Sequence, residues 1–175
     1  LPSQSSGRVQ ADVMVVLALS KSMLAEDAAP SRLDRAKSEI LELSVQLSGY
    51  RLGLVGFAGR ASVLCPLTTD LGFFSLALNN ADPSSISRGG TRIGEAIRTA
   101  VKAFGPGQSP RLMLLITDGE DHDSYPQEAA EADAAETAPT TLAPVEIAVL
   151  EFRNLPSQVR VSSSEEQVRV ALPQR

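Results

Sequence analysis

The sequence predicts a doubly wound α/β domain, with a mostly parallel sheet, one antiparallel edge strand and helices on both faces. Two observations lead to this class. Short apolar runs rich in Val, Leu and Ile, such as 12–19 and 111–117, are typical of strands buried on both faces. Between them lie segments with apolar residues at steps of three and four, which indicate amphipathic helices. Strands that alternate with helices favour a parallel sheet with right-handed crossovers.

The first elements follow this pattern closely. The run "DVMVVLAL" at 12–19 is the first predicted strand, and a polar loop follows it. A helix is predicted over 31–47, where Ser31 and Asp34 resemble a capping box and Gly49 ends the helix. Residues 50–58 form the second predicted strand.

Residues 60–67 follow the second strand too soon for a crossover helix, so we expect an antiparallel hairpin there. The remaining patterns predict helices over 71–80, 91–104 and 125–137, and strands over 111–117 and 145–152.

The chain divides into three predicted parts: a polar lead over 1–11, the α/β domain over 12–152 and a divergent tail over 153–175. The tail repeats Val-Arg-Val, which indicates a hairpin or a strand added at the sheet edge. Because the chain begins with Leu1 and a polar stretch, we expect a soluble piece of a longer protein. No apolar stretch reaches the length that spans a membrane.

Composition argues against several function classes. The net charge is −5 and no dense basic patch is present, which argues against nucleic acid as a partner. Cys65 is the sole cysteine, so an internal disulfide is excluded. Neither G-x-S-x-G nor a phosphate-binding glycine loop is present, and one histidine gives a weak case for a catalytic triad. The sequence therefore predicts a protein that is not an enzyme.

Polar residues follow the predicted strands at the edge where doubly wound sheets bind ligands. Three loops should meet there, and they carry Ser20 with Ser22, Thr91 after two glycines, and Asp118 in "TDGED". Hydroxyl and carboxylate oxygens suit Mg²⁺, Mn²⁺ or Ca²⁺ rather than zinc.

Each of these residues also has a plainer interpretation. Ser20 and Ser22 are common turn residues, Thr91 could simply cap the following helix, and Asp118-Gly119 alone is a generic turn. The acidic residues Glu120, Asp121 and Asp123 suit a solvated loop, and His122 suits the surface.

The order of these motifs resembles a von Willebrand factor A (VWA) domain. The strings "SMLAEDAAPSRLDRAK", "GLVGFAGRASVLCPLTTD" and "LLITDGEDHD" are similar to those of bacterial aerotolerance (Bat-type) proteins. The resemblance implies a Rossmann-like fold and a metal-ion-dependent adhesion site (MIDAS) formed by Ser20, Ser22, Thr91 and Asp118. It also implies an Asp at position 18, where this chain has Ala18. The tail departs from the family as well, since it lacks the usual glycine-containing finish.

The resemblance implies a protein-binding module that recognises an Asp or Glu of a partner through a divalent cation. Ala18 removes one anion from that site, so we expect weak or absent metal binding here, whether the alanine is natural or engineered. The family also implies a membrane-anchored bacterial protein, on a membrane side left open, and a MoxR-type AAA+ ATPase as a partner. Two alternatives stay open: a metal-independent scaffold or assembly domain of a membrane-anchored complex, and a metal-dependent hydrolase using Asp118.

Overall fold

The computed structural model describes residues 11–86, 89–107, 109–118, 145–151, 158–162 and 167–170. Within them lies a seven-stranded sheet of order β3-β2-β1-β4-β5-β6-β7. The strands are β1 (Asp12–Ala18), β2 (Arg51–Phe57), β3 (Ala61–Thr68), β4 (Arg111–Thr117), β5 (Val145–Glu151), β6 (Gln158–Ser162) and β7 (Gln167–Val170). The helices are α1 (Arg32–Gln46), α2 (Leu71–Asn80) and α3 (Ile93–Phe104), with short 3₁₀ turns η1 (Lys21–Leu24) and η2 (Pro83–Ser85).

The strand pairings confirm the predicted class. β1 runs parallel to both β2 and β4, and β4 runs parallel to β5, while β3 is antiparallel to β2 as expected of the edge hairpin. β6 and β7 continue the sheet beyond β5 with two further antiparallel pairings. The sheet is therefore doubly wound around β1, with antiparallel strands at both ends. The division of the chain into lead, domain and tail stays a prediction.

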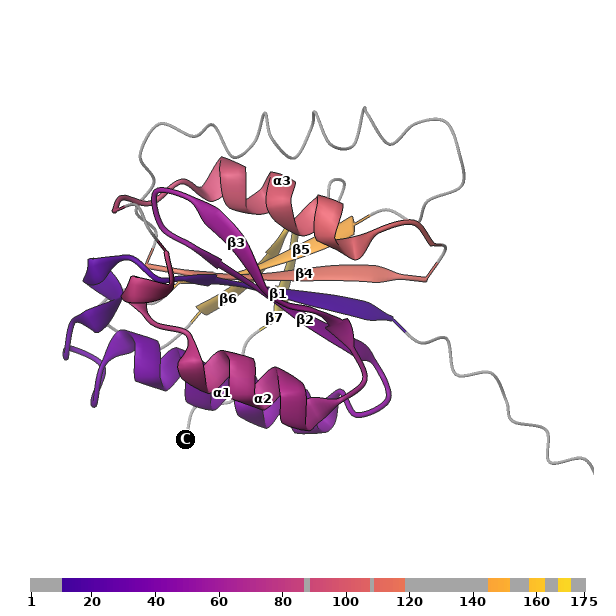
Figure 1. Ribbon diagram of the computed structural model, residues 1–175, viewed down its shortest axis with the longest axis horizontal. Coiled ribbons are helices and arrows are strands. Elements are labelled where there is room, and N and C mark those ends of the chain that lie inside the picture. The colour runs from indigo at the N-terminus through magenta and orange to yellow at the C-terminus, as the bar shows by residue number, and fades with distance from the viewer. Residues whose placement is uncertain are drawn as a thin grey trace, which may run out of the picture.

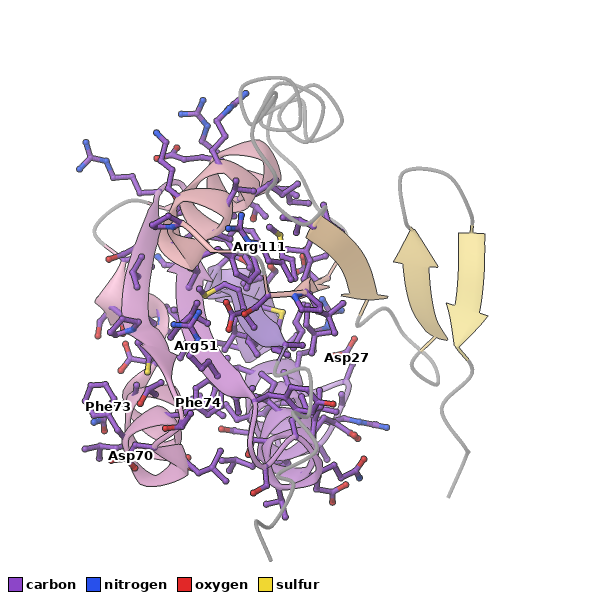
Figure 2. The ribbon with its side chains drawn as sticks, turned by 90° about the vertical axis from the view of Figure 1, so that its right-hand side faces the viewer. Asp27, Arg51, Asp70, Phe73, Phe74 and Arg111 are labelled. Carbon is purple, nitrogen blue, oxygen red and sulfur yellow. The ribbon has the colours of Figure 1, made fainter. Side chains whose placement is uncertain are left out.

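Helices cover both faces of the sheet. Figure 1 shows α1 and α2 together on one face and α3 on the other. Every residue of β1 is buried, because this central strand is covered on both sides. On α2, Phe74 is fully buried while its neighbour Phe73 is half exposed (Figure 2), so this helix turns one face to the sheet.

Local chemistry explains where the helices begin and end. Ser31 precedes α1, and its hydroxyl accepts a hydrogen bond from the Asp34 amide at 3.0 Å and donates one to Asp34 Oδ2 at 2.8 Å. The predicted cap is thus confirmed, with aspartate in the place of the usual glutamate. α3 begins two residues later than predicted, with Arg92 at its N-cap. It ends at Phe104 and is followed by the C-cap residue Gly105, whose positive φ of 66° favours glycine.

The outermost strand β3 is irregular. Its register with β2 shifts between Leu52 and Leu54 and again between Leu54 and Val55. It also contains the exposed Pro66, which has no amide hydrogen to donate. Irregular pairing of this kind is common at sheet edges.

Some predictions lie outside the described residues: the helix over 125–137, and the acidic loop with Glu120, Asp121, His122 and Asp123. Across the described ranges, none of the helices combines the length and the apolar character needed to traverse a bilayer.

Candidate functional site

The carboxyl end of β1 brings the first two hydroxyls together. The strand ladder extends past Ala18, because the Leu19 amide donates to the Phe57 carbonyl oxygen at 2.7 Å. Ser20 is still extended, and the chain then turns into η1. This turn sets Ser20 Oγ 2.8 Å from Ser22 Oγ, within hydrogen-bond distance.

The loop before α3 brings Thr91 to the same place. The Arg92 amide donates to the carbonyl oxygen of Ala58 at 2.9 Å, which ties this loop to the end of β2. Gly90, directly before Thr91, has a φ of 111°, a conformation that L side chains rarely adopt. Thr91 is only 1% exposed.

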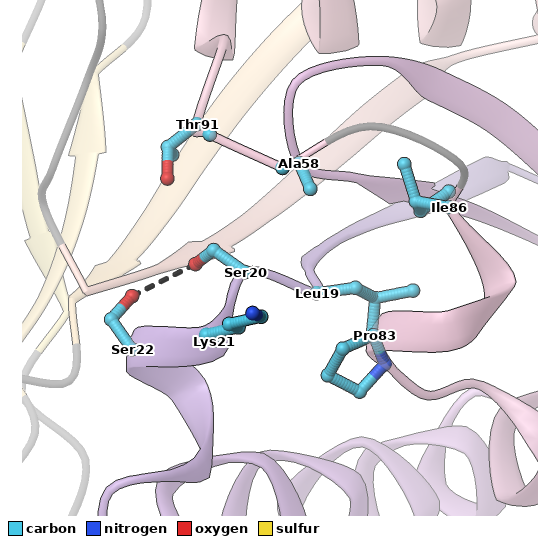
Figure 3. Close-up of a pocket in the computed structure, with 10 residues that line it drawn as sticks. Leu19, Ser20, Lys21, Ser22, Ala58, Pro83, Ile86 and Thr91 are labelled. Carbon is cyan, nitrogen blue, oxygen red and sulfur yellow. Dashed lines mark hydrogen bonds between the residues drawn. The ribbon is translucent and has the colours of Figure 1, made fainter.

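These three hydroxyl residues line one pocket of about 400 Å³ (Figure 3). Its remaining walls are mostly apolar, and one lysine lies at the rim. The lining residues are Leu19, Ser20, Lys21, Ser22, Ala58, Pro83, Ile86, Gly89, Gly90 and Thr91. A concave site with apolar walls and a few convergent polar groups is the usual form of a binding site.

Asp118 lies at the same edge of the sheet but does not line this pocket. It follows β4 directly, and β4 pairs with β1 so that Ile116 is opposite Leu17. Its side chain is only 1% exposed, and Oδ2 lies 3.5 Å from Nη1 of Arg32. The structure therefore unites Ser20, Ser22 and Thr91 in the pocket and sets Asp118 on the adjoining strand end, in an ion pair.

Arg32 is a residue of this site that sequence reasoning missed. It is the first residue of α1, and its Nε and Nη2 donate to Asp27 Oδ1 and Oδ2 at 2.8 and 2.6 Å. This hydrogen-bonded guanidinium holds the pKa of Asp27 below its usual value. The string "AEDAAPSRLDRAK" contains both partners, but the pairing with Asp118 depends on the fold.

Ala18, the last residue of β1, is fully buried and pairs with Phe57. Because side chains alternate along a strand, its Cβ points to the same side as that of Ser20, two residues on. A methyl group there supplies no oxygen. As a donor set for a divalent cation, the described residues offer hydroxyls and one carboxylate already paired with Arg32. Such a set does not fit a hard dication well, since Mg²⁺ requires near-octahedral oxygen coordination and sheds water reluctantly.

Other candidate groups take no part in this site. Within the described ranges, no group of three or more His, Cys, Asp or Glu side chains is arranged to hold a metal ion. Cys65 is buried as predicted, and its burial raises the pKa of the thiol, which disfavours the reactive thiolate.

Fold and site together define a doubly wound α/β domain with a hydroxyl-lined binding edge. Residues 13–120 match the family model of the von Willebrand factor type A domain. The chain belongs to this family, whose members are generally protein-interaction modules and in some cases act through a MIDAS.

A bacterial relative is similar to this chain in sequence. A UPF0353 protein of Mycolicibacterium paratuberculosis is 36% identical over 130 residues, covering 69% of this chain and 38% of that protein. The chain thus spans well under half the length of this relative.

Two solved structures from Bacteroides are also similar. BatB from B. thetaiotaomicron has a TM-score of 0.74 and 33% identity, covering 91% of this chain and 75% of that one. An aerotolerance-related membrane protein from B. fragilis has a TM-score of 0.73 and 30% identity, covering 91% and 81%. The predicted family and its Bat-type branch are confirmed.

A more distant structure shares the fold alone. Proximal thread matrix protein 1 of the mussel byssus, solved with zinc in its MIDAS motif, has a TM-score of 0.63 and 20% identity. It covers 80% of this chain and 37% of that one. The zinc in the MIDAS motif is a property of that mussel protein.

Proposed function

We propose that this chain is a protein-binding module that recognises a partner at the carboxyl end of its sheet, with a MIDAS impaired by Ala18. The pocket lined by Ser20, Ser22 and Thr91 supports the location, since binding sites of open α/β sheets lie at that edge. The alanine itself is the observation that carries the proposal. It is fully buried on the side of Ser20, where the family has a carboxylate.

The cation is the weak part of the site. Ser20, Ser22, Thr91 and Asp118 are the ligands that the family assigns, and hydroxyls carry no charge to offset the dehydration of Mg²⁺. The remaining carboxylate already faces Arg32 at 3.5 Å. We therefore expect partner binding by this chain to depend little on metal.

Calorimetric titration with MgCl₂ or MnCl₂ tests the impairment. Wild type should bind Mg²⁺ weakly or not at all, and Ala18→Asp should bind it at least about tenfold more tightly than the wild type or its detection limit, which corresponds to ~1.4 kcal/mol. Ala18→Asn, which matches aspartate in size but lacks its charge, is the control and should stay close to wild type. Equal affinity of wild type and Ala18→Asp would refute the role given to Ala18.

The partner is proposed to be a protein that offers an Asp or Glu side chain, and a MoxR-type AAA+ ATPase is the candidate from the family resemblance. Pull-down of such an ATPase by wild type should be unchanged by EDTA, and with Ala18→Asp it should increase when Mg²⁺ is added. We also propose that the full-length protein is anchored in a bacterial membrane, because the B. fragilis relative is named an aerotolerance-related membrane protein.

A metal-independent scaffold is the second candidate, favoured by the alanine and by the additional strands β6 and β7 at one end of the sheet. In that case, partner binding should ignore both EDTA and the Ala18→Asp exchange. A binding module rather than an enzyme is expected. Turnover of an ester or phosphate substrate that is lost in Asp118→Asn would instead support the hydrolase alternative.

A further inference from the structure

We propose that the guanidinium of Arg32 is the resident cation of this site and takes the place of a divalent metal ion beside Asp118. The inference rests on the proposed function only for the assignment of this face as the VWA site. The new element is that Arg32 balances the negative charge of the buried Asp118 carboxylate.

The first step is the burial of the anion. The Asp118 side chain is 1% exposed, and a carboxylate so far removed from water is costly unless a positive charge lies near it. Ser20, Ser22 and Thr91 are neutral and cannot supply that charge. Arg32 Nη1 lies 3.5 Å from Asp118 Oδ2, close enough for strong attraction where water is largely excluded.

The second step is the fixed position of the guanidinium. The Arg32 amide donates to the Ala25 carbonyl oxygen at 2.9 Å, which holds the start of α1 against the loop after η1. Its Nε and Nη2 donate in a fork to the Asp27 carboxylate. One edge of the guanidinium is thus held by Asp27 while Nη1 faces Asp118, and the side chain is 18% exposed. Arginine suits this role because its planar guanidinium carries five N–H donors, so that one edge can bind Asp27 while Nη1 faces Asp118.

The third step is the charge balance. With Ala18 in β1, Asp118 is the buried carboxylate that Nη1 of Arg32 faces, while Asp27, which shares the guanidinium, is 30% exposed and partly hydrated. An aspartate at position 18 would add a second buried anion, which this shared guanidinium would not balance. Alanine at this position and a cation supplied by α1 are therefore mutually consistent.

The test is a double-mutant cycle of thermal unfolding on variants that all keep Ala18. Arg32→Gln should lower the melting temperature by about 6–12 °C, because it leaves Asp118 without this counter-charge. The matched control is Arg35→Gln on the exposed side of the same helix, which should cost less than about 2 °C. Arg32→Gln combined with Asp118→Asn should lose less than the two single changes added together.

A readout with metal separates a resident cation from an ordinary structural ion pair. Millimolar MgCl₂, compared with NaCl at equal ionic strength, should raise the melting temperature of Arg32→Gln and leave wild type and Arg35→Gln unchanged. Additive losses in the cycle, no Mg²⁺ response of Arg32→Gln, or an equal response of wild type would each overturn the proposal.

If Arg32→Gln does not fold, the double variant decides. Recovery of folding on adding Asp118→Asn supports the proposal, and no recovery overturns it. Failure of Ala18→Asp to gain metal affinity would count against the proposed function, and it would leave this cycle unaffected.

Discussion

The two ends of the parallel strands are built from similar residues with different geometry. At the amino end, the Asp12 carboxylate of β1 accepts two parallel hydrogen bonds from Arg51 of β2. The Nε and Nη2 atoms lie 2.7 and 2.6 Å from its two oxygens. At the carboxyl end, Asp118 lies 3.5 Å from Arg32, whose own fork is directed at a different carboxylate, Asp27.

At the amino end, the charged side chains bind other groups of the same chain. Besides the Asp12–Arg51 pair, Arg111 of β4 donates through Nη2 to the carbonyl oxygens of Gly105 and Gly107 at 2.7 and 3.1 Å. The carboxyl end instead keeps a pocket lined by hydroxyls. Within one sheet, therefore, the amino end pairs its charged side chains with one another, and the carboxyl end keeps hydroxyl side chains around a pocket.

The largest expected effect is at the amino end, on removal of Arg51. Arg51→Ala leaves the Asp12 carboxylate, 5% exposed, without its fork, and should cost about 3 kcal/mol of unfolding free energy. Asp12→Ala should cost less, about 2 kcal/mol, because the 42% exposed Arg51 side chain can turn to water. Urea unfolding measures both.

Arg60→Ala is the matched control for this pair, since Arg60 is exposed just beyond the same strand, and it should change little. A larger loss for Asp12→Ala than for Arg51→Ala would contradict the assignment of Asp12 as the buried partner.

An intermediate effect is expected from the cap that positions α1. Ser31→Ala removes the hydrogen bond to the Asp34 amide and should cost about 1 kcal/mol. Since Ser31 directly precedes Arg32, the exchange should also loosen the carboxyl end, seen as faster amide hydrogen exchange at the start of α1. Ser38→Ala, an exposed position inside the same helix, is the control. Equal effects of the two exchanges would argue against the cap.

The smallest effect is expected from Asp27→Asn. Arg32 lowers the pKa of Asp27, so this carboxylate stabilises the fold at pH values above its ordinary pKa, and that stabilisation is lost as the pH falls through the lowered value. The variant should therefore melt slightly below wild type at neutral pH and match it in strong acid. Melting curves over an acid pH series provide the measurement, and a difference that grows toward low pH would reverse the sign argued here.

Sequence patterns predicted the class of fold because the central strands β1, β2 and β4 are largely apolar and the helices carry regular apolar faces. β2 and α1 differ from their predicted bounds by one residue at each end, and the antiparallel turn after β2 followed from the short span to β3. Ser20 and Ser22 could be paired in advance because they are two residues apart. Arg32 could not be paired with Asp118 in advance, since that contact depends on where the fold brings the first residue of α1 relative to the residue after β4. Lys21 at the pocket rim was likewise not singled out, since a lone loop lysine has no distinguishing pattern.

The interrupted register of β3 and its Pro66 bear on how this protein meets other molecules. A regular edge strand would offer a continuous row of unpaired backbone amide and carbonyl groups. A second chain could form hydrogen bonds along this row, which is a common start of fibrous aggregation. Here that row is bent and lacks one donor, so growth of the sheet past β3 is discouraged. Association of several copies of the domain through their β3 edges is therefore disfavoured, even at high protein concentration.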